Sequence, residues 1–185
     1  MTMANLYQMN LVGLARLTTL DLGDYFLRPL EIGDLLDYHE LTSNDEALQY
    51  DYPAHKDLEE SLQMLVKWNL ASPIGRYGIV NKQVNKLIGN ISLTLSENGE
   101  VCTIGYAVNY NYWRQGIASF CVAQLLQVAT NYLTIKEFQA KVHQGNTGGI
   151  KLLEKLGFKK VGEEETSSLR YDHFIELTYC KPINN

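Results

Sequence analysis

One segment of this chain combines residue types and spacing that favour binding of an anion. Residues 112–118 read Tyr-Trp-Arg-Gln-Gly-Ile-Ala, and a helical pattern of apolar residues begins directly after Gly116. A loop that opens into a helix presents unpaired backbone N–H groups beside the positive end of the helix dipole. Gly116 permits close approach of a ligand, and Arg114 adds a fixed positive charge. The segment predicts a pyrophosphate-binding turn, although ordinary strand-to-helix turns share this pattern.

The neighbouring sequence predicts the elements that would position this turn. Residues 104–108 alternate in the manner of a strand, and the helix after Gly116 extends to about Tyr132. Residues 137–143 form a second strand-like run, followed by a short helix over residues 146–157 that ends at Gly157. A strand-helix-strand crossover makes the two strands parallel neighbours in the middle of a sheet.

The rest of the chain predicts a mixed α+β domain without repeats or linkers. Strands are expected at residues 20–28, 77–81, 87–95, 102–108, 136–143, 158–165 and 170–179, and further helices at residues 31–42 and 57–72. Residues 20–185 are expected to form one domain. Residues 1–19 are neither a secretory signal nor a transmembrane span, and three roles stay open for them: an extra helix packed outside, a contact for a partner, or a leader derived from cloning.

Composition excludes several classes of function. The formal net charge of −5 argues against a nucleic-acid-binding protein and mildly favours a cationic acceptor. Cys102, Cys121 and Cys180 are odd in number and widely spaced, which predicts no disulfide framework and suits a reducing cytoplasm. The four histidines show no ligand spacing, so we expect no metal. We expect no membrane association, and either a monomer or a homodimer.

The two glycine-containing blocks together resemble the GNAT superfamily of acyl-CoA-dependent N-acyltransferases, and most closely its RimJ/RimL type, the ribosomal-protein N-terminal acetyltransferases. The likeness covers about residues 20–179 and is carried by Arg28-Pro29-Leu30, Ile104-Gly105-Tyr106, residues 112–118, Asn146 and residues 152–158. It implies a mixed, mainly antiparallel seven-stranded sheet with a central, splayed parallel pair and about four flanking helices. The sequence pattern predicts the same order of elements independently.

The resemblance also implies where acetyl-CoA binds. Backbone N–H groups would hold the pyrophosphate, and the pantetheine arm would run along the exposed edge of one splayed strand. The implied contacts are Tyr106, Ala107, Val108, Trp113, Arg114, Gln115, Gly116, Ile117, Ala118 and Asn146. Asn146 equally suits an N-cap for the helix that follows it. Tyr50, Asp51 and Tyr52 are candidate acceptor contacts. Alternatively, the two tyrosines are ordinary loop residues that pack on a neighbouring apolar surface.

The usual catalytic side chains of the family are missing from this sequence. The positions that hold its tyrosine acid, its alternative serine and its acidic residue are Leu153, Gly149 and Thr103. Four other residues are candidates for proton transfer: Glu100, His143, Tyr106 and Asp51. Proximity and orientation alone also support considerable catalysis.

Two functional hypotheses follow from these observations. The first is an acetyl-CoA-dependent N-acetyltransferase in which a deprotonated amine, on a protein N-terminus or a small molecule, attacks the thioester directly. The second is a catalytically degenerate acyl-CoA-binding module that senses or regulates. A nucleotide-binding domain is poorly supported, because no G-x-G-x-x-G or P-loop motif follows a strand.

Overall fold

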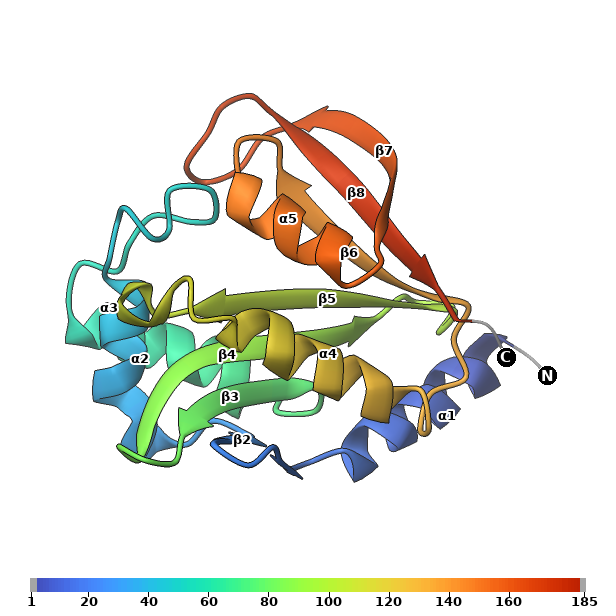
Figure 1. The fold of residues 1–185 in the computed structure, drawn as a ribbon, viewed down its shortest axis with the longest axis horizontal. Helices are drawn as coiled ribbons and strands as arrows, with labels where there is room; N and C mark the ends of the chain where they lie inside the picture. Colours follow the sequence, from blue (N-terminus) through green and yellow to red (C-terminus); the bar gives the residue numbers. More distant parts are fainter. Residues whose placement is uncertain (1–2, 184–185) are drawn as a thin grey trace.

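A single twisted sheet organises the molecule (Figure 1). The computed structural model describes residues 3–183, and its strands lie in the order β1-β2-β3-β4-β5-β6-β8-β7. The strands are β1 (Leu20–Asp21), β2 (Tyr25–Arg28), β3 (Arg76–Asn81), β4 (Lys86–Leu95), β5 (Val101–Val108), β6 (Glu137–His143), β7 (Lys159–Thr166) and β8 (Phe174–Pro182). The α-helices are α1 (Met3–Arg16), α2 (Leu35–Thr42), α3 (Leu58–Leu65), α4 (Ile117–Ala129) and α5 (Thr147–Lys155).

The sheet opens between its two central strands. β5 and β6 are parallel and pair only from Val101 opposite Glu137 to Thr103 opposite Gln139. β5 is held by β4 along its length, and β6 by β8, so the two strands separate beyond Thr103 as Figure 1 shows. All other strand pairs are antiparallel. The predicted mixed sheet with a splayed parallel pair is therefore confirmed.

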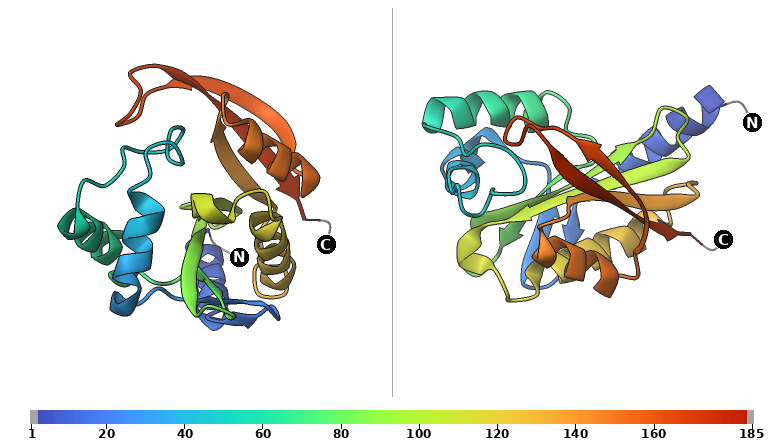
Figure 2. Two further views of the ribbon diagram at one scale, coloured as in Figure 1. Left: turned by 60° about the vertical axis from the view of Figure 1, so that its left-hand side comes forward. Right: turned by 90° about the horizontal axis from the view of Figure 1, so that it is seen from above.

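Helices cover both faces of the sheet. Figure 2 shows α2 and α3 on the side opposite α4 and α5. Under α4 the core contains fully buried side chains such as Ile91, Leu125 and Phe138. A second cluster of buried residues, including Tyr38 and Leu65, lies between the sheet and α2 and α3. No helix within residues 3–183 has both the length and the apolar character needed to cross a membrane.

Helix α1 packs into the same core as the rest of the chain. The side chain of Asn10 is buried; its amide N–H groups donate to the carbonyls of Gly99 (2.8 Å) and Thr134 (2.9 Å), and its oxygen accepts from the Thr134 N–H (2.7 Å). Leu14 and Leu17 are each 3% exposed. The described residues contain five α-helices instead of the expected four, and α1 is the additional one.

Some boundaries differ from those predicted. The expected strand over residues 20–28 is two strands, because Gly23 adopts φ +80° in a turn that folds β1 onto β2. The sheet therefore has eight strands among the described residues. The last strand begins at Phe174 instead of Arg170, since Arg170 and Tyr171 contact the loop between α2 and α3. A 3₁₀ turn, η1 (Ile32–Asp34), precedes α2, and a π-helical turn, η2 (Val66–Leu70), follows α3.

Candidate active site

The predicted anion-binding turn lies directly before α4. Gly116 is the N-cap of this helix with φ +77°, and Arg114 also adopts a left-handed conformation with φ +60°. Such conformations curl a loop so that successive N–H groups converge on one point. A Cβ atom built on Gly116 would meet no atom of the described residues within 4 Å, so the backbone there is open to a ligand.

A polar network holds the loop before this turn against α2. The buried side chain of Asn109 accepts from the Asn111 N–H (3.0 Å) and donates to Glu40 Oε1 (2.9 Å). Lys86 Nζ donates to the other oxygen of Glu40 (2.5 Å). These hydrogen bonds, that of Lys86 first, lower the pKa of Glu40 below its usual value. A charged anchor on α2 and β4 therefore fixes the loop at the C-terminal end of β5.

The open edge of β5 presents backbone groups to the gap in the sheet. The Asn109 N–H donates to the Ile88 carbonyl (2.8 Å) at the β4 side. Because hydrogen bonding alternates along an antiparallel pair, Ala107 also directs its backbone toward β4, whereas Tyr106 and Val108 direct theirs toward the gap. The Trp113 indole N–H donates to the Val108 carbonyl (2.6 Å). The Val108 carbonyl is therefore occupied by Trp113, whereas the Val108 N–H faces the gap without a partner from a neighbouring strand.

A cavity of about 570 Å³ joins the turn, the open strand edge and the start of α5. Every predicted acetyl-CoA contact except Gln115 lines this donor cavity. The Gln115 side chain points back along the loop and donates to the Asn111 carbonyl (3.4 Å). Sequence reasoning missed Lys151, Thr147 and Tyr112, which also line it.

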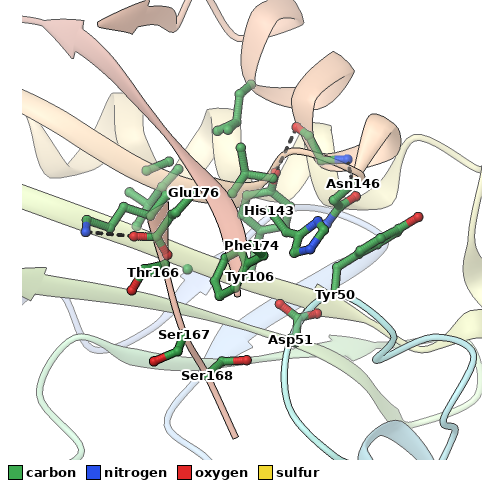
Figure 3. Close-up of a pocket in the computed structure, with 17 residues that line it drawn as sticks. Tyr50, Asp51, Tyr106, His143, Asn146, Thr166, Ser167, Ser168, Phe174 and Glu176 are labelled. Carbon is green, nitrogen blue, oxygen red and sulfur yellow. Dashed lines mark hydrogen bonds and ion pairs between the residues drawn. The ribbon is translucent and has the colours of Figure 1, made fainter. Parts of the chain in front are cut away.

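A second cavity of about 320 Å³ lies beside the first, on the side of β6 and β8 (Figure 3). Its walls come from the α2–α3 loop, β5, β6, α5 with its N-cap, the end of β7, the β7–β8 loop and β8. This acceptor cavity shares five lining residues with the donor cavity: Tyr50, Asp51, Tyr106, Asn146 and Gly149. The two cavities therefore meet where the strands separate.

Hydrogen bonds order the junction between the cavities. The Tyr106 hydroxyl donates to the Gly149 carbonyl (3.3 Å), and the Gly149 N–H donates to Asn146 Oδ1 (2.8 Å). Asn146 is thus the N-cap of α5 and at the same time lines both cavities. Burial, and next the charge of Asp51, raise the pKa of Tyr106, which keeps its hydroxyl protonated at neutral pH.

Asp51 is the acidic group at this junction. Its side chain is exposed to the cavity, yet the surrounding walls remove enough water to raise its pKa. No hydrogen bond to its carboxylate is present within residues 3–183. An unpaired carboxylate in a cleft suits an incoming cation.

His143 forms an aromatic wall of the acceptor cavity. Its ring stacks on Phe174 with centroids 4.8 Å apart, and Tyr50 and Tyr171 lie at 4.9 and 5.1 Å. The Gly145 N–H donates to its Nδ1 (2.9 Å), and burial lowers its pKa. This hydrogen bond assigns the neutral tautomer with the proton on Nε2. That tautomer makes His143 a poor general base.

Besides Gln115, two of the predicted residues line neither cavity. Glu100 lies in the β4–β5 turn, at the far end of β5 from Val108, and pairs with Lys136 (2.7 Å). The Tyr52 ring turns away and stacks on His55 with centroids 5.7 Å apart. Both are corrections to the sequence prediction. Leu153 does reach the acceptor cavity as a wall, but it is 1% exposed and supplies no proton.

Several residues of the acceptor cavity were missed from the sequence, because they belong to β6, β8 and the β7–β8 loop and have no local signature. They are Lys141, Ser167, Ser168, Phe174 and Glu176, with Thr166 at the edge. Period-two alternation identifies their strands but not the face that borders a cavity.

Comparison with known proteins agrees with this geometry. A curated relative, the uncharacterized N-acetyltransferase p20 of Bacillus licheniformis, is 30% identical over 142 residues, or 74% of this chain and 79% of that protein. A GNAT-family acetyltransferase structure from Bacillus anthracis covers 89% of this chain and 98% of its own, with a TM-score of 0.79 and 19% identity. The ribosomal L7/L12 alpha-N-protein acetyltransferase RimL, solved in complex with coenzyme A, covers 87% of this chain and 95% of its own, with a TM-score of 0.75 and 20% identity. The family model described as acetyltransferase (GNAT) domain matches residues 25–159, and the chain belongs to this family of N-acetyltransferases.

Proposed function

We propose that this protein transfers the acetyl group of acetyl-CoA to a primary amine, by direct attack of the amine within a ternary complex. The observation that carries the proposal is the meeting of two cavities at the open edge of β5. One cavity borders an anion-binding helix start, and the other contains an unpaired carboxylate.

Acetyl-CoA fits the donor cavity through groups of matching chemistry. The N–H groups between Arg114 and Ala118 would hold the pyrophosphate, with the dipole of α4 adding to the attraction. The pantetheine arm would lie along Tyr106–Val108 in the manner of an added strand, with Asn146 beside it. The coenzyme A bound to RimL supports the same use of this fold. Acetyl-CoA then supplies an activated acyl group as a thioester.

The residues at the junction would divide the chemistry among them. Asp51 orients the acceptor and takes a proton from its ammonium group, which frees the nitrogen lone pair. The nitrogen attacks the thioester carbon, and the Val108 N–H stabilises the oxyanion. When the C–S bond breaks, its electron pair stays on sulfur, and the Tyr106 hydroxyl donates the proton that forms the free thiol. As the amide forms, the remaining excess proton of the nitrogen passes through solvent to the Tyr106 oxygen, and Asp51 releases its proton to solvent.

The direct test measures release of free coenzyme A thiol and the mass of the acetylated product, with purified protein, acetyl-CoA and a panel of amines. We expect multiple turnovers with at least one amine, and saturable binding of acetyl-CoA by calorimetry. No measurable affinity for acetyl-CoA would sink the proposal. Tight binding without transfer to any amine would favour the degenerate sensor instead, a role that no contact among the described residues favours.

We infer a cytoplasmic location from the cysteines. Cys102, Cys121 and Cys180 are buried and unpaired with one another, and burial raises the pKa of Cys102 and Cys121 to about 12. Free, unreactive thiols suit a reducing compartment. We keep both a monomer and a homodimer as states to be distinguished by light scattering.

A further inference from the structure

We propose, resting on the function above, that the acceptor is a small primary amine with an apolar or aromatic body and no carboxylate or phosphate, and that it is not a protein N-terminus. Three features of the acceptor cavity support this: a contact that closes over it, the pairing of its charges, and its aromatic wall.

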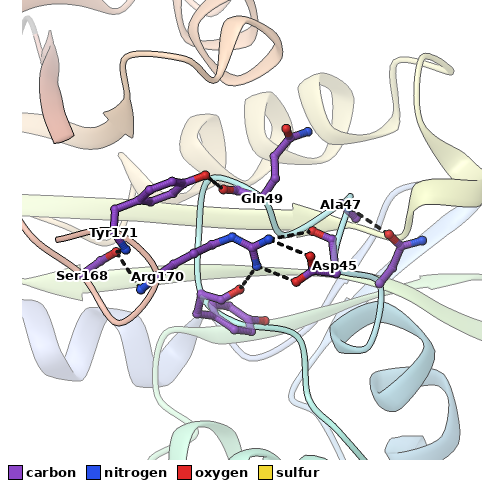
Figure 4. Close-up of polar contacts among 8 residues, drawn as sticks. Asp45, Ala47, Gln49, Ser168, Arg170 and Tyr171 are labelled. Atoms are coloured by element: carbon purple, nitrogen blue, oxygen red, sulfur yellow. Dashed lines mark hydrogen bonds and ion pairs between the residues drawn. The ribbon is translucent and has the colours of Figure 1, made fainter. Parts of the chain in front are cut away.

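The first feature is a clasp between two loops that are far apart in the sequence (Figure 4). The Arg170 guanidinium donates to both carboxylate oxygens of Asp45, at 2.7 and 2.8 Å. The Tyr171 hydroxyl donates to the Gln49 carbonyl. Ser168 Oγ accepts from the N–H groups of Arg170 (3.2 Å) and Tyr171 (3.1 Å), which shapes the β7–β8 loop for these contacts. Bidentate Arg–carboxylate pairs have a more defined geometry than single ion pairs.

The clasp joins opposite walls of the acceptor cavity. Gln49 directly precedes Tyr50 and Asp51 on one wall, and Ser168 belongs to the other. The cavity volume of about 320 Å³ is near the lower end of ligand pockets. It is about ten times the ~30 Å³ that one water molecule occupies in the liquid. A space of this size suits a small molecule. In a protein acceptor, the residues that follow the N-terminus would also have to pass between the joined loops.

The second feature is the pairing of charges around the cavity. Lys141 Nζ lies 2.7 Å from Glu176 and 2.8 Å from Glu164, so this cation is already satisfied by two carboxylates. His143 is neutral, and Arg170 is occupied by Asp45. Among the described lining residues, no cation is left to pair with an anionic group of an acceptor, while Asp51 is left for an ammonium. An acceptor that carries a carboxylate would be desolvated here without compensation.

The third feature is the aromatic wall. The rings of Tyr50, His143 and Phe174 line one side of the cavity, and Figure 3 shows them around the same space as Asp51. Flat apolar surfaces of this kind bury an apolar or aromatic body. The cavity thus combines one anionic end with one apolar side, which defines an amine whose remaining part is uncharged.

The experiment compares acceptors that differ in one feature, using the full chain and acetyl-CoA. Tyramine and tyrosine share a phenol and an amine, and only tyrosine carries a carboxylate; phenethylamine and phenylalanine form a second pair. A pentapeptide with a free N-terminus and a side-chain phenol represents a protein terminus. We expect kcat/KM for each amine to exceed that of its amino acid at least about tenfold, and that of the peptide by a similar factor.

Clasp variants test the cause of this selectivity. R170A and D45N each remove the ion pair, and we expect either change to raise the peptide-to-tyramine ratio of kcat/KM by about threefold or more. E163Q is the matched control, because it breaks an exposed ion pair with Lys160 on β7 (2.5 Å) away from both cavities. It should leave the ratio unchanged. Melting curves verify that all variants are folded.

The results separate this inference from the function on which it rests. Turnover of peptides or amino acids at a rate equal to or above that of the matched amines would overturn the inference and leave the acetyltransferase intact. An unchanged ratio in both clasp variants would overturn the closing role of the clasp. Failure to bind acetyl-CoA, or to acetylate any member of the panel, would overturn the function and the inference with it.

Discussion

The donor and acceptor cavities share a border but are built in different ways. The donor cavity owes its character to backbone: a left-handed turn at Gly116, a helix start and an unpaired strand edge, much of it within residues 106–119. The acceptor cavity owes its character to residues from seven segments of the chain, two of which are joined by a contact between Asp45 and Arg170. Donor binding should therefore depend on conformation, and acceptor choice on the identity of individual side chains.

The largest effect is expected where the two cavities meet. Y106F removes the hydroxyl and keeps the ring, so we expect kcat to fall by roughly 100-fold, the low end for loss of a general acid. KM for acetyl-CoA should change little, because the backbone of Tyr106 still lines the gap. Steady-state kinetics with tyramine checks both values. A loss confined to KM would instead assign the hydroxyl to binding and remove Tyr106 from the chemistry.

The second effect tests whether backbone conformation governs donor binding. G116A places a Cβ atom on a residue with φ +77°, in the open space where the pyrophosphate is proposed to bind. We expect the Kd for acetyl-CoA to rise roughly tenfold to thirtyfold by calorimetry.

Gly23 provides the matched control for this change. It has φ +80° and equally open surroundings, but it lies in the β1–β2 turn and lines neither cavity. Both alanine variants should lose about 1–2 kcal/mol of stability from left-handed strain. Only G116A should lose affinity; equal affinities in the two variants would contradict a backbone cradle at Gly116.

A smaller effect is expected for Trp113, whose side chain hydrogen-bonds to the open edge of β5. W113F keeps an aromatic ring beside Tyr110 and removes the hydrogen bond to the Val108 carbonyl. Loss of this bond frees the carbonyl and loosens the loop, so KM for acetyl-CoA should rise about fivefold, in line with one neutral hydrogen bond. The selectivity between tyramine and tyrosine should stay constant. A change in that selectivity would show that the two cavities are less separable than proposed.

The same contrast explains how far the sequence predicts the molecule. Strand alternation, helical periodicity and the Gly116 turn are local signals that predicted most of the sheet, and together with the family resemblance they led to a set of donor contacts that, except for Gln115, line one cavity. The acceptor cavity has no local signal, since Asp45 and Arg170 are 125 residues apart in sequence. Glu100 was a candidate by residue type alone, and only the sheet register shows that it lies at the wrong end of β5.

The smallest effect compares two aspartates in the acceptor loop whose pKa values shift in opposite directions. Burial raises the pKa of Asp51, so this carboxyl lowers stability increasingly as the pH rises above the unfolded pKa, and fully once the pH exceeds the raised value. D51N should therefore stabilise the protein at neutral pH by under about 1 kcal/mol, because water in the cavity screens the charge. Well below the unfolded pKa of about 3.9 the carboxyl is neutral in both states, and the gain should vanish. Tyr106, which lines both cavities with Asp51, and Tyr52, the next residue in the sequence, have raised pKa values and stay neutral over this range.

Asp45 should show the reverse dependence. Its hydrogen bonds to Arg170 lower its pKa, so its contribution to stability is present above the unfolded pKa and is lost as the pH falls through the lowered value. D45N should therefore lower Tm at pH 7 and approach the parent protein only as the pH falls below the lowered pKa of Asp45, whereas D51N should raise Tm at pH 7. Melting curves at several pH values measure both differences. If D51N lowers Tm at pH 7, the Asp51 carboxylate has a stabilising partner in the folded protein and is not held free for an amine.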